Sequence, residues 1–219
     1  MMKFDIVTIF PGIFDSYFSE SIIKRAKNGN FIDIKIHNLR DFTHDNHKTV
    51  DDTPYGGGAG MVMKIEPIYD CLKYVESNLK IQKSKTRIIL FSAKGKRYTQ
   101  EDAKRLSHYE NLILLCGRYE GVDERVAENL IDEEVSIGDF VLTGGEIPAM
   151  VIVDSITRLI PGVLGNVQSI EIESHSSEGY LEYPQYTKPD KFMDWKVPEV
   201  LLSGDHEKIA QWRKDNSKK

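Results

Sequence analysis

Three short loops, rich in glycine and small polar residues, have the composition of a ligand-binding site. They read SAKG at 92–95, GRYEG at 117–121 and SIGDFVLTGG at 136–145, and each follows or overlaps the end of a short apolar segment. Ligands of open α/β sheets bind beyond the carboxyl ends of the strands, and glycine lets the backbone approach a ligand closely. Three such loops in succession therefore favour one shared site over three unrelated turns.

The residue types in these loops restrict the ligand. The sequence has no GxxxxGK[ST] phosphate loop, and no GxGxxG motif follows its first predicted strand. The loops offer backbone amides, one tyrosine and one glutamate, which suit a mostly neutral, adenosine-like group better than a triphosphate. Covalent catalysis by Ser92 is not expected, because no nucleophile-elbow motif accompanies it.

Two further loops could also do chemistry. The glycine-rich string at 55–60 could cradle a phosphate or a flat base, or it could be a flexible turn. His44 and His47 lie among aspartates in a way that superficially resembles a metal cluster. They show no helical spacing, so polar packing within the loop is the preferred interpretation.

The elements that would position these loops follow from hydrophobic periodicity. Strands are predicted at 3–10, 31–39, 87–91, 111–116 and 134–137, and helices at 13–28, 66–79, 99–107, 122–130 and 146–160. This alternation predicts an α/β fold with a mostly parallel sheet covered on both faces.

The character of the chain changes after Gly162. Residues 1–162 are predicted to form the ligand-binding domain, and 163–183, rich in serine, glycine and glutamate, a flexible linker. Residues 184–219 are predicted to form a small second domain, whose helix starts after Ser203 or Asp205 and runs through Trp212.

Bulk properties limit the class of protein. The chain has 219 residues, a net charge of −5 and two cysteines, with no CxxC spacing, no long apolar stretch and no signal peptide pattern at its start. A cytoplasmic location is expected, and a disulfide framework, a zinc site and a membrane span are not. Nine basic residues lie between Lys80 and Arg105 against two acidic ones. This segment could hold phosphates or could be an ordinary solvated surface, and both readings remain open.

Several strings together resemble one family, the bacterial tRNA (guanine-N1) methyltransferases. They are HKTVDD at 47–52, PYGGG at 54–58, CGRYEGVDER at 116–125, SIGDFVLTGGE at 136–146, DSITRLIPGVLG at 154–165 and YPQYTKP at 183–189. The resemblance covers nearly the whole chain. It implies a knotted, SPOUT-class catalytic domain with a deep trefoil knot, an obligate homodimer with active sites shared between subunits, and a small helical C-terminal domain that contacts tRNA.

The resemblance also implies roles for individual residues. S-adenosylmethionine would be bound by Leu90, Phe91, Ser92, Ala93, Gly117, Tyr119, Glu120, Gly121, Ile137, Gly138, Asp139, Phe140, Val141, Leu142, Gly144 and Gly145. The target guanine would be framed by Asp52, Tyr55, Gly57 and Gly58. A magnesium requirement is suggested as well, although no convincing ligand cluster is visible in the sequence.

Two catalytic residues are implied in the same way. Arg158 matches the family's catalytic arginine, and Glu173 matches its general base, which is usually an aspartate. Glu171 is an alternative base, because the string around both glutamates is atypical of the family. N1 of guanine carries a proton at neutral pH, so a carboxylate would accept that proton and the arginine would stabilise charge developing at O6.

Two other functions stay open from the sequence. One is a knotted methyltransferase with another RNA target, against which the strings at 55–60 and 183–189 argue. The other is a binding module that has lost activity, which the glutamate in place of the family's aspartate favours. Methyl transfer to a tRNA transcript separates this inactive module from a tRNA methyltransferase.

Overall fold

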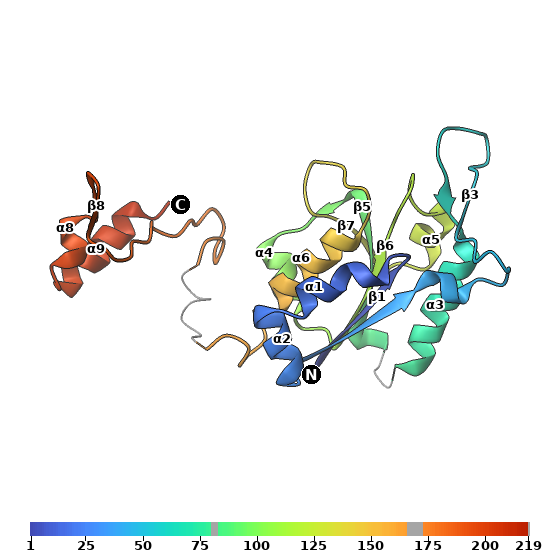
Figure 1. Cartoon of the computed structure of the whole chain (residues 1–219), viewed down its shortest axis with the longest axis horizontal. Helices are drawn as coiled ribbons and strands as arrows, with labels where there is room; N and C mark the ends of the chain where they lie inside the picture. The colour runs from blue at the N-terminus through green and yellow to red at the C-terminus, as the bar shows by residue number, and fades with distance from the viewer. Residues whose placement is uncertain (80–82, 166–172, 219) are drawn as a thin grey trace. The chain divides into compact units, whose positions relative to one another are not determined.

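A computed structural model describes residues 1–79, 83–165 and 173–218 of the chain. The chain divides into two compact units, Met1–Gly165 and Asn166–Lys219, which are described separately (Figure 1). No helix among the described residues is long and apolar enough to cross a membrane.

The first unit is built on a five-stranded parallel sheet. Its strands are β1 (Met2–Thr8), β2 (Ile32–Asn38), β5 (Thr86–Arg97), β6 (Asn111–Cys116) and β7 (Glu133–Ser136), arranged in the order β2-β1-β6-β5-β7. All six residues of β6 are buried, as expected for a central strand covered on both faces. The predicted α/β class with a mostly parallel sheet is therefore confirmed.

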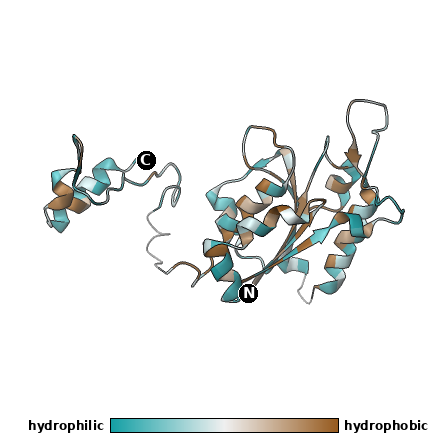
Figure 2. Cartoon of the chain, in the orientation of Figure 1, coloured by the Kyte–Doolittle hydropathy of each residue, from teal (hydrophilic) through white to brown (hydrophobic). Residues whose placement is uncertain are grey.

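Helices cover both faces of this sheet. One face packs against η1 (Pro11–Phe14), α1 (Asp15–Phe18), α2 (Ser21–Asn28), α4 (Gln100–Leu106) and α6 (Glu146–Thr157). The other face packs against η2 (Leu39–Phe42), α3 (Ile65–Asn78) and α5 (Glu124–Asn129). The central strands are largely hydrophobic, and hydrophilic and hydrophobic residues alternate along the helices, as is typical of helices that pack one side on a sheet (Figure 2). A short 3-10 turn, η3 (Lys83–Lys85), precedes β5, and a small antiparallel sheet, β3 (Asp51–Asp52) and β4 (Val62–Met63), flanks the unit.

The helix predicted at 13–28 is wrong as a single element. The segment is divided into η1, α1 and α2, and Glu20 between α1 and α2 has an extended backbone. Ser21 then has φ +48°. Phe14, Phe18 and Ile23 are all buried, so the apolar spacing that suggested one helix serves the core across a break.

The start of α4 follows from local chemistry. The Thr99 hydroxyl accepts a hydrogen bond from the Asp102 amide, and the Asp102 carboxylate accepts one from the Thr99 amide. This capping box satisfies two amides that a helix start leaves without partners. The helix predicted after Thr99 is confirmed.

The second unit contains a hairpin of β8 (Lys191–Phe192) and β9 (Trp195–Lys196), followed by α8 (Glu199–Leu202) and α9 (His206–Asn216). Asp205 caps α9 by accepting a hydrogen bond from the Lys208 amide. Part of the predicted linker, 166–172, lies outside the described residues. Nearer its end, Tyr183 packs against Trp212 of α9, and Leu181 pairs with Lys218.

Candidate active site

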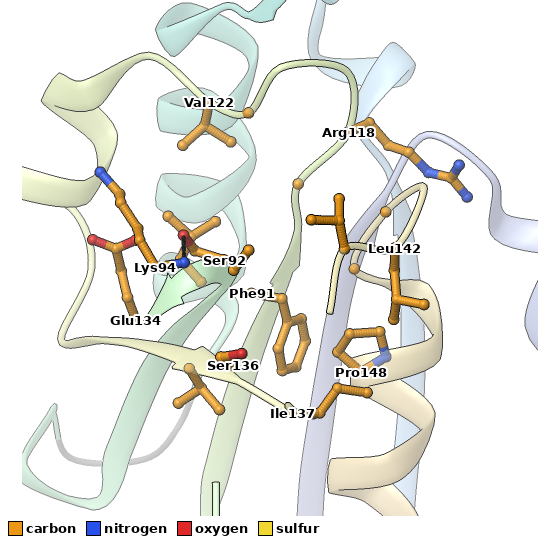
Figure 3. Close-up of a pocket in the computed structure, with 18 of the residues that line it drawn as sticks. Phe91, Ser92, Lys94, Arg118, Val122, Glu134, Ser136, Ile137, Leu142 and Pro148 are labelled. Atoms are coloured by element: carbon orange, nitrogen blue, oxygen red, sulfur yellow. Dashed lines mark hydrogen bonds between the residues drawn. The ribbon is translucent and has the colours of Figure 1, made fainter. Parts of the chain in front are cut away.

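A cavity of about 470 Å³ lies at the carboxyl ends of β6 and β7 and beside residues 90–94 of β5, where the register of that strand shifts (Figure 3). It is lined by the three loops singled out in the sequence. Every residue predicted to bind the cofactor lines it except Asp139, whose carboxylate lies 3.4 Å from the Arg97 guanidinium. Phe91, Leu142 and Pro148 contribute apolar walls.

Glycine is needed where the third loop meets the second. The Gly145 amide donates a hydrogen bond to the Gly117 carbonyl at 3.0 Å. A Cβ at Gly145 would lie 2.6 Å from the Cα of Cys116, which no side chain tolerates. The loop therefore packs directly onto the end of β6, backbone against backbone.

Arg118 fastens these two loops together. Its Nε and Nη2 donate to Glu146 Oε2 at 3.0 and 2.9 Å, and its Nη1 donates to the Thr143 carbonyl at 3.0 Å. Its guanidinium also lies over the Phe10 ring, 4.6 Å from the centroid. In Figure 3 the Arg118 side chain points away from the cavity, so it holds the wall from outside.

Glu146 is the buried centre of this network. Its side chain is 1% exposed, and its Oε1 accepts a hydrogen bond from the Thr8 hydroxyl at 2.8 Å. Neighbouring Cys116 is fully buried, and desolvation together with the charge of Glu146 raises the pKa of its thiol well above the usual value. Sequence reasoning missed the roles of Thr8, Arg118 and Glu146, because their partners are far apart in the chain.

The cavity wall carries more negative than positive charge. Glu120, Glu124 and Glu134 line it, together with a single lysine, Lys94. The Lys94 ammonium lies 2.8 Å from Glu124, and this hydrogen bond raises the pKa of Lys94. Because Lys94 pairs with Glu124 and Arg118 with Glu146, the described lining residues offer no unpaired cation to hold a triphosphate.

The glycine-rich loop meets the second cavity loop but lines no part of the cavity. The Glu120 amide donates to the Met61 carbonyl at 3.0 Å, and a Cβ at Gly60 would lie 2.6 Å from Glu120. Tyr55 is fully exposed, and Gly57 and Gly58 both have positive φ. Asp52 is exposed in β3. This loop stands next to the cavity with its aromatic tip in solvent.

The predicted catalytic arginine does not lie at the cavity of its own unit. Arg158 is the C-cap of α6, whereas the cavity lies at the N-terminal end of the same helix, at Gly145 and Pro148. Twelve helical residues separate the two ends, which corresponds to roughly 18 Å. Glu173 lies in the second unit, and Glu171 lies outside the described residues.

The segment between Lys80 and Arg105 is mostly neutralised by carboxylates. Ion pairs join Lys85, Arg87, Lys94, Lys96, Arg97 and Arg105 to acidic partners. The Glu133 carboxylate accepts hydrogen bonds from both Arg87 and Arg105. These contacts favour the interpretation of the segment as an ordinary solvated surface over that of a phosphate-binding segment.

The histidine loop is held by its own polar groups. Asp45 accepts hydrogen bonds from the amides of His47 and Thr49 and from the Thr49 hydroxyl. His44 pairs with Asp70 at 2.8 Å. Within the ranges that the structure describes, no group of three or more metal-ligating side chains is found.

Comparison with known proteins agrees with this geometry. The model of the tRNA (Guanine-1)-methyltransferase TrmD family matches residues 2–219. The chain belongs to this family. It is 52% identical over 216 residues to the tRNA (guanine-N(1)-)-methyltransferases of Dehalococcoides mccartyi and Geobacter sulfurreducens, covering 99% of this chain and 86% of each relative. It is also 52% identical to that of Clostridioides difficile, covering 99% of this chain and 92% of the relative.

Proposed function

We propose that this chain transfers the methyl group of S-adenosylmethionine to N1 of the guanine immediately 3′ of the tRNA anticodon. The observation that carries the proposal is the cavity formed by loops 92–95, 117–121 and 136–145 in a member of this methyltransferase family. Its volume lies within the range of sites that hold a drug-sized ligand or cofactor.

The lining of the cavity fits S-adenosylmethionine. Carboxylates of Glu120, Glu124 and Glu134 favour a cationic sulfonium, and the apolar walls at Phe91 and Leu142 suit an adenine ring. The exposed backbone of the third loop can read the edges of that ring by hydrogen bonds. When bound, the cofactor supplies an activated methyl group, so the protein has to orient, desolvate and remove a proton.

In this proposal Glu173 is the general base and Arg158 stabilises the charge at O6 of the guanine. A carboxylate within hydrogen-bond reach accepts the N1 proton as the methyl group approaches, and a guanidinium lowers the energy of the developing anion. Glu171 stays the alternative base. Asp52, Tyr55, Gly57 and Gly58 would frame the guanine, which the position of their loop beside Glu120 supports.

The placement of Arg158 supports a homodimer with shared active sites. An arginine at the far end of α6 cannot reach the cavity of its own chain, so a second copy would have to supply it. Exposed apolar side chains of Phe10, Ile13, Ile147 and Val151 lie on or beside η1 and α6, which pack against each other. A patch of this kind on neighbouring elements is typical of a subunit interface.

A trefoil knot around the cavity is also part of the proposal. The family resemblance carries this part, and it fits the β5–β7 ladder, in which β7 pairs at Ile89–Phe91 and again at Lys96–Arg97 with a register shift between Phe91 and Lys96. A Cβ at Gly95 would lie 2.6 Å from the Val135 amide nitrogen, so residue 95 packs directly against the backbone of β7. A cytoplasmic location and a role for magnesium are proposed from the family resemblance alone, and no step is assigned to the metal.

Methyl transfer tests the activity directly. Purified protein is incubated with radiolabelled S-adenosylmethionine and a tRNA transcript that has guanine 3′ to the anticodon, and with the same transcript carrying adenine there. We expect transfer only to the guanine transcript, with losses on the order of 10²-fold or more in Glu173→Gln and Arg158→Ala. Loss in Glu171→Gln instead would reassign the base, and no transfer by the unmodified chain would refute the function.

Subunit mixing tests the shared site. Two variants are needed. Arg158→Ala removes the guanidinium, and Ser92→Trp fills the cavity that Ser92 lines. If Arg158 serves the partner's cavity, a mixed dimer has one site with both defects and one intact site. Equal mixing should then restore about a quarter of wild-type activity. Activity that stays at the level of the separate variants would mean that Arg158 serves its own chain.

A further inference from the structure

The hairpin of the second unit carries two different faces. Strands β8 and β9 pair antiparallel, with Phe192 opposite Trp195 and Lys191 opposite Lys196. Because successive side chains of a strand alternate between faces, the two aromatic rings share one face and the two lysines share the other. The hairpin thus places an aromatic pair and a basic pair on six consecutive residues.

The aromatic face is open to solvent. The Phe192 and Trp195 rings lie with centroids 6.0 Å apart and planes inclined by 42°. The two residues are 56% and 71% exposed, and Met193 at the turn is 70% exposed. Side-by-side aromatic rings that remain this exposed mark an interaction surface, because their hydration is unfavourable.

The two lysines form no ion pair with Asp194, the carboxylate at the turn of the hairpin. Like charges directly opposite each other on a ladder destabilise it, and neither Lys191 nor Lys196 forms an ion pair within the described part of the chain. This contrasts with the segment 83–105 of the first unit, where Glu133 and Asp102 hold several cations. An incoming anion would relieve the repulsion between the two ammonium groups.

We propose that the hairpin 191–196 is an RNA-binding wedge, which stacks unpaired tRNA bases on Phe192 and Trp195 and holds the flanking phosphates with Lys191 and Lys196. This inference rests on the proposed function, since it takes tRNA to be the substrate. Aromatic rings beside basic side chains bind unstacked RNA with little sequence preference. A second copy of the chain is the alternative occupant of this surface, and the measurements below separate it from RNA.

Tryptophan fluorescence tests the stacking. The chain has two tryptophans, so Trp212→Phe leaves Trp195 as the only one. We expect tRNA to quench the Trp195 emission, and a perfectly paired RNA duplex of equal length to quench it much less. Unchanged emission, while a separate filter-binding assay shows tRNA bound, would overturn the stacking proposal.

Charge variants test the phosphate contacts. In Lys191→Gln/Lys196→Gln we expect several-fold weaker tRNA binding, and a slope of log K against log salt that is smaller by about 1.4, since each single-strand phosphate contact contributes about 0.7. Lys208→Gln is the matched control, because Lys208 already pairs with Asp205 in the same unit. The KM for S-adenosylmethionine should not change. A double variant with the salt slope of the unmodified chain would overturn the proposal.

Truncating the rings separates RNA from other partners. Phe192→Ala/Trp195→Ala should weaken tRNA binding by about 30-fold or more, since each of the two stacked bases contributes about 1–3 kcal/mol. Light scattering on the same variant gives the oligomeric state. A loss of dimer with unchanged tRNA affinity would assign the hairpin to a subunit interface and overturn the proposal. A chain that binds tRNA through the hairpin but does not methylate it would refute the proposed function and leave this inference standing.

Discussion

The basic segment 83–105 and the hairpin 191–196 are similar in composition and opposite in environment. In the first, carboxylates from other elements meet most of the cations: Glu133 from β7 holds Arg87 and Arg105, and Asp102 holds Lys96. In the second, two lysines lie opposite each other, and neither forms an ion pair within the described residues, although Asp194 lies at the turn between them. A run of basic residues therefore does not predict nucleic-acid binding until the positions of the carboxylates that pair with it are known.

The same distinction extends into the core of the first unit. Arg118 and Glu146 form the most enclosed ion pair at the cavity, with side chains 17% and 1% exposed. Charged side chains that pair within the chain stabilise the fold, whereas charged side chains without such a partner are available to bind a ligand. Removing one member of each class should separate the two roles.

The largest expected effect on stability is from Glu146→Gln. The substitution removes the carboxylate from a buried pair and leaves the Arg118 charge without a partner, which destabilises by about 3–5 kcal/mol. Loops 117–121 and 136–145 should loosen together, so affinity for S-adenosylmethionine should fall as well. Denaturant unfolding and calorimetric titration of the cofactor measure the two quantities.

Glu128→Gln is the control for this prediction, because Glu128 is exposed on α5 and its side chain makes no hydrogen bond within the described residues. It should unfold like the unmodified chain. A Glu146→Gln protein that matched this control in stability would mean that the Arg118 network does not hold the cavity wall.

A smaller effect is expected at Glu133. Burial alone would raise the pKa of Glu133, but hydrogen bonds from Arg105 and Arg87 outweigh it and lower the pKa below the usual value. A carboxylate whose pKa is lowered on folding stabilises the protein above the ordinary carboxyl range, and this contribution is lost as pH falls through the lowered pKa. Glu133→Gln should therefore cost about 1–2 kcal/mol at neutral pH and flatten the loss of stability in acid.

Unfolding midpoints between neutral pH and the acid limb test this, with Asp139→Asn as a control at an exposed ion pair. If Glu133→Gln and the unmodified chain lose stability in parallel as the pH falls, the Glu133 pairs do not contribute. In that case the ion pairs of the basic segment would differ from the unpaired lysines of the hairpin in position, but they would not add to the free energy of unfolding.

The sequence predicts the sheet and the three cavity loops because both follow from local pattern. Apolar runs such as 111–116 have the length of buried strands, and parallel strands necessarily bring the loops after them to one edge. For this reason nearly all of the predicted cofactor residues line one cavity.

The partners of charged residues could not be predicted in this way. Glu146 lies 28 residues from Arg118 and 138 from Thr8, and no periodicity connects them. The break between α1 and α2 was also missed, because buried side chains on both sides of it keep helical spacing. Only the folded arrangement shows which cations are neutralised, and the basic segment could not be assigned a role without it.

The smallest effect is expected from Lys94→Gln, and this variant compares the two regions most directly. Lys94 and Glu124 have side chains about 60% exposed, so their pair should contribute less than about 1 kcal/mol to unfolding. Because Glu124 already neutralises the lysine, tRNA affinity should not change, in contrast to Lys191→Gln at the hairpin. Filter binding of both single variants at two salt concentrations provides the measurement. If both variants weaken tRNA binding equally, pairing with a carboxylate of the same chain does not keep a lysine from contacting RNA. The affinity would then depend on the number of cations and not on whether they are paired.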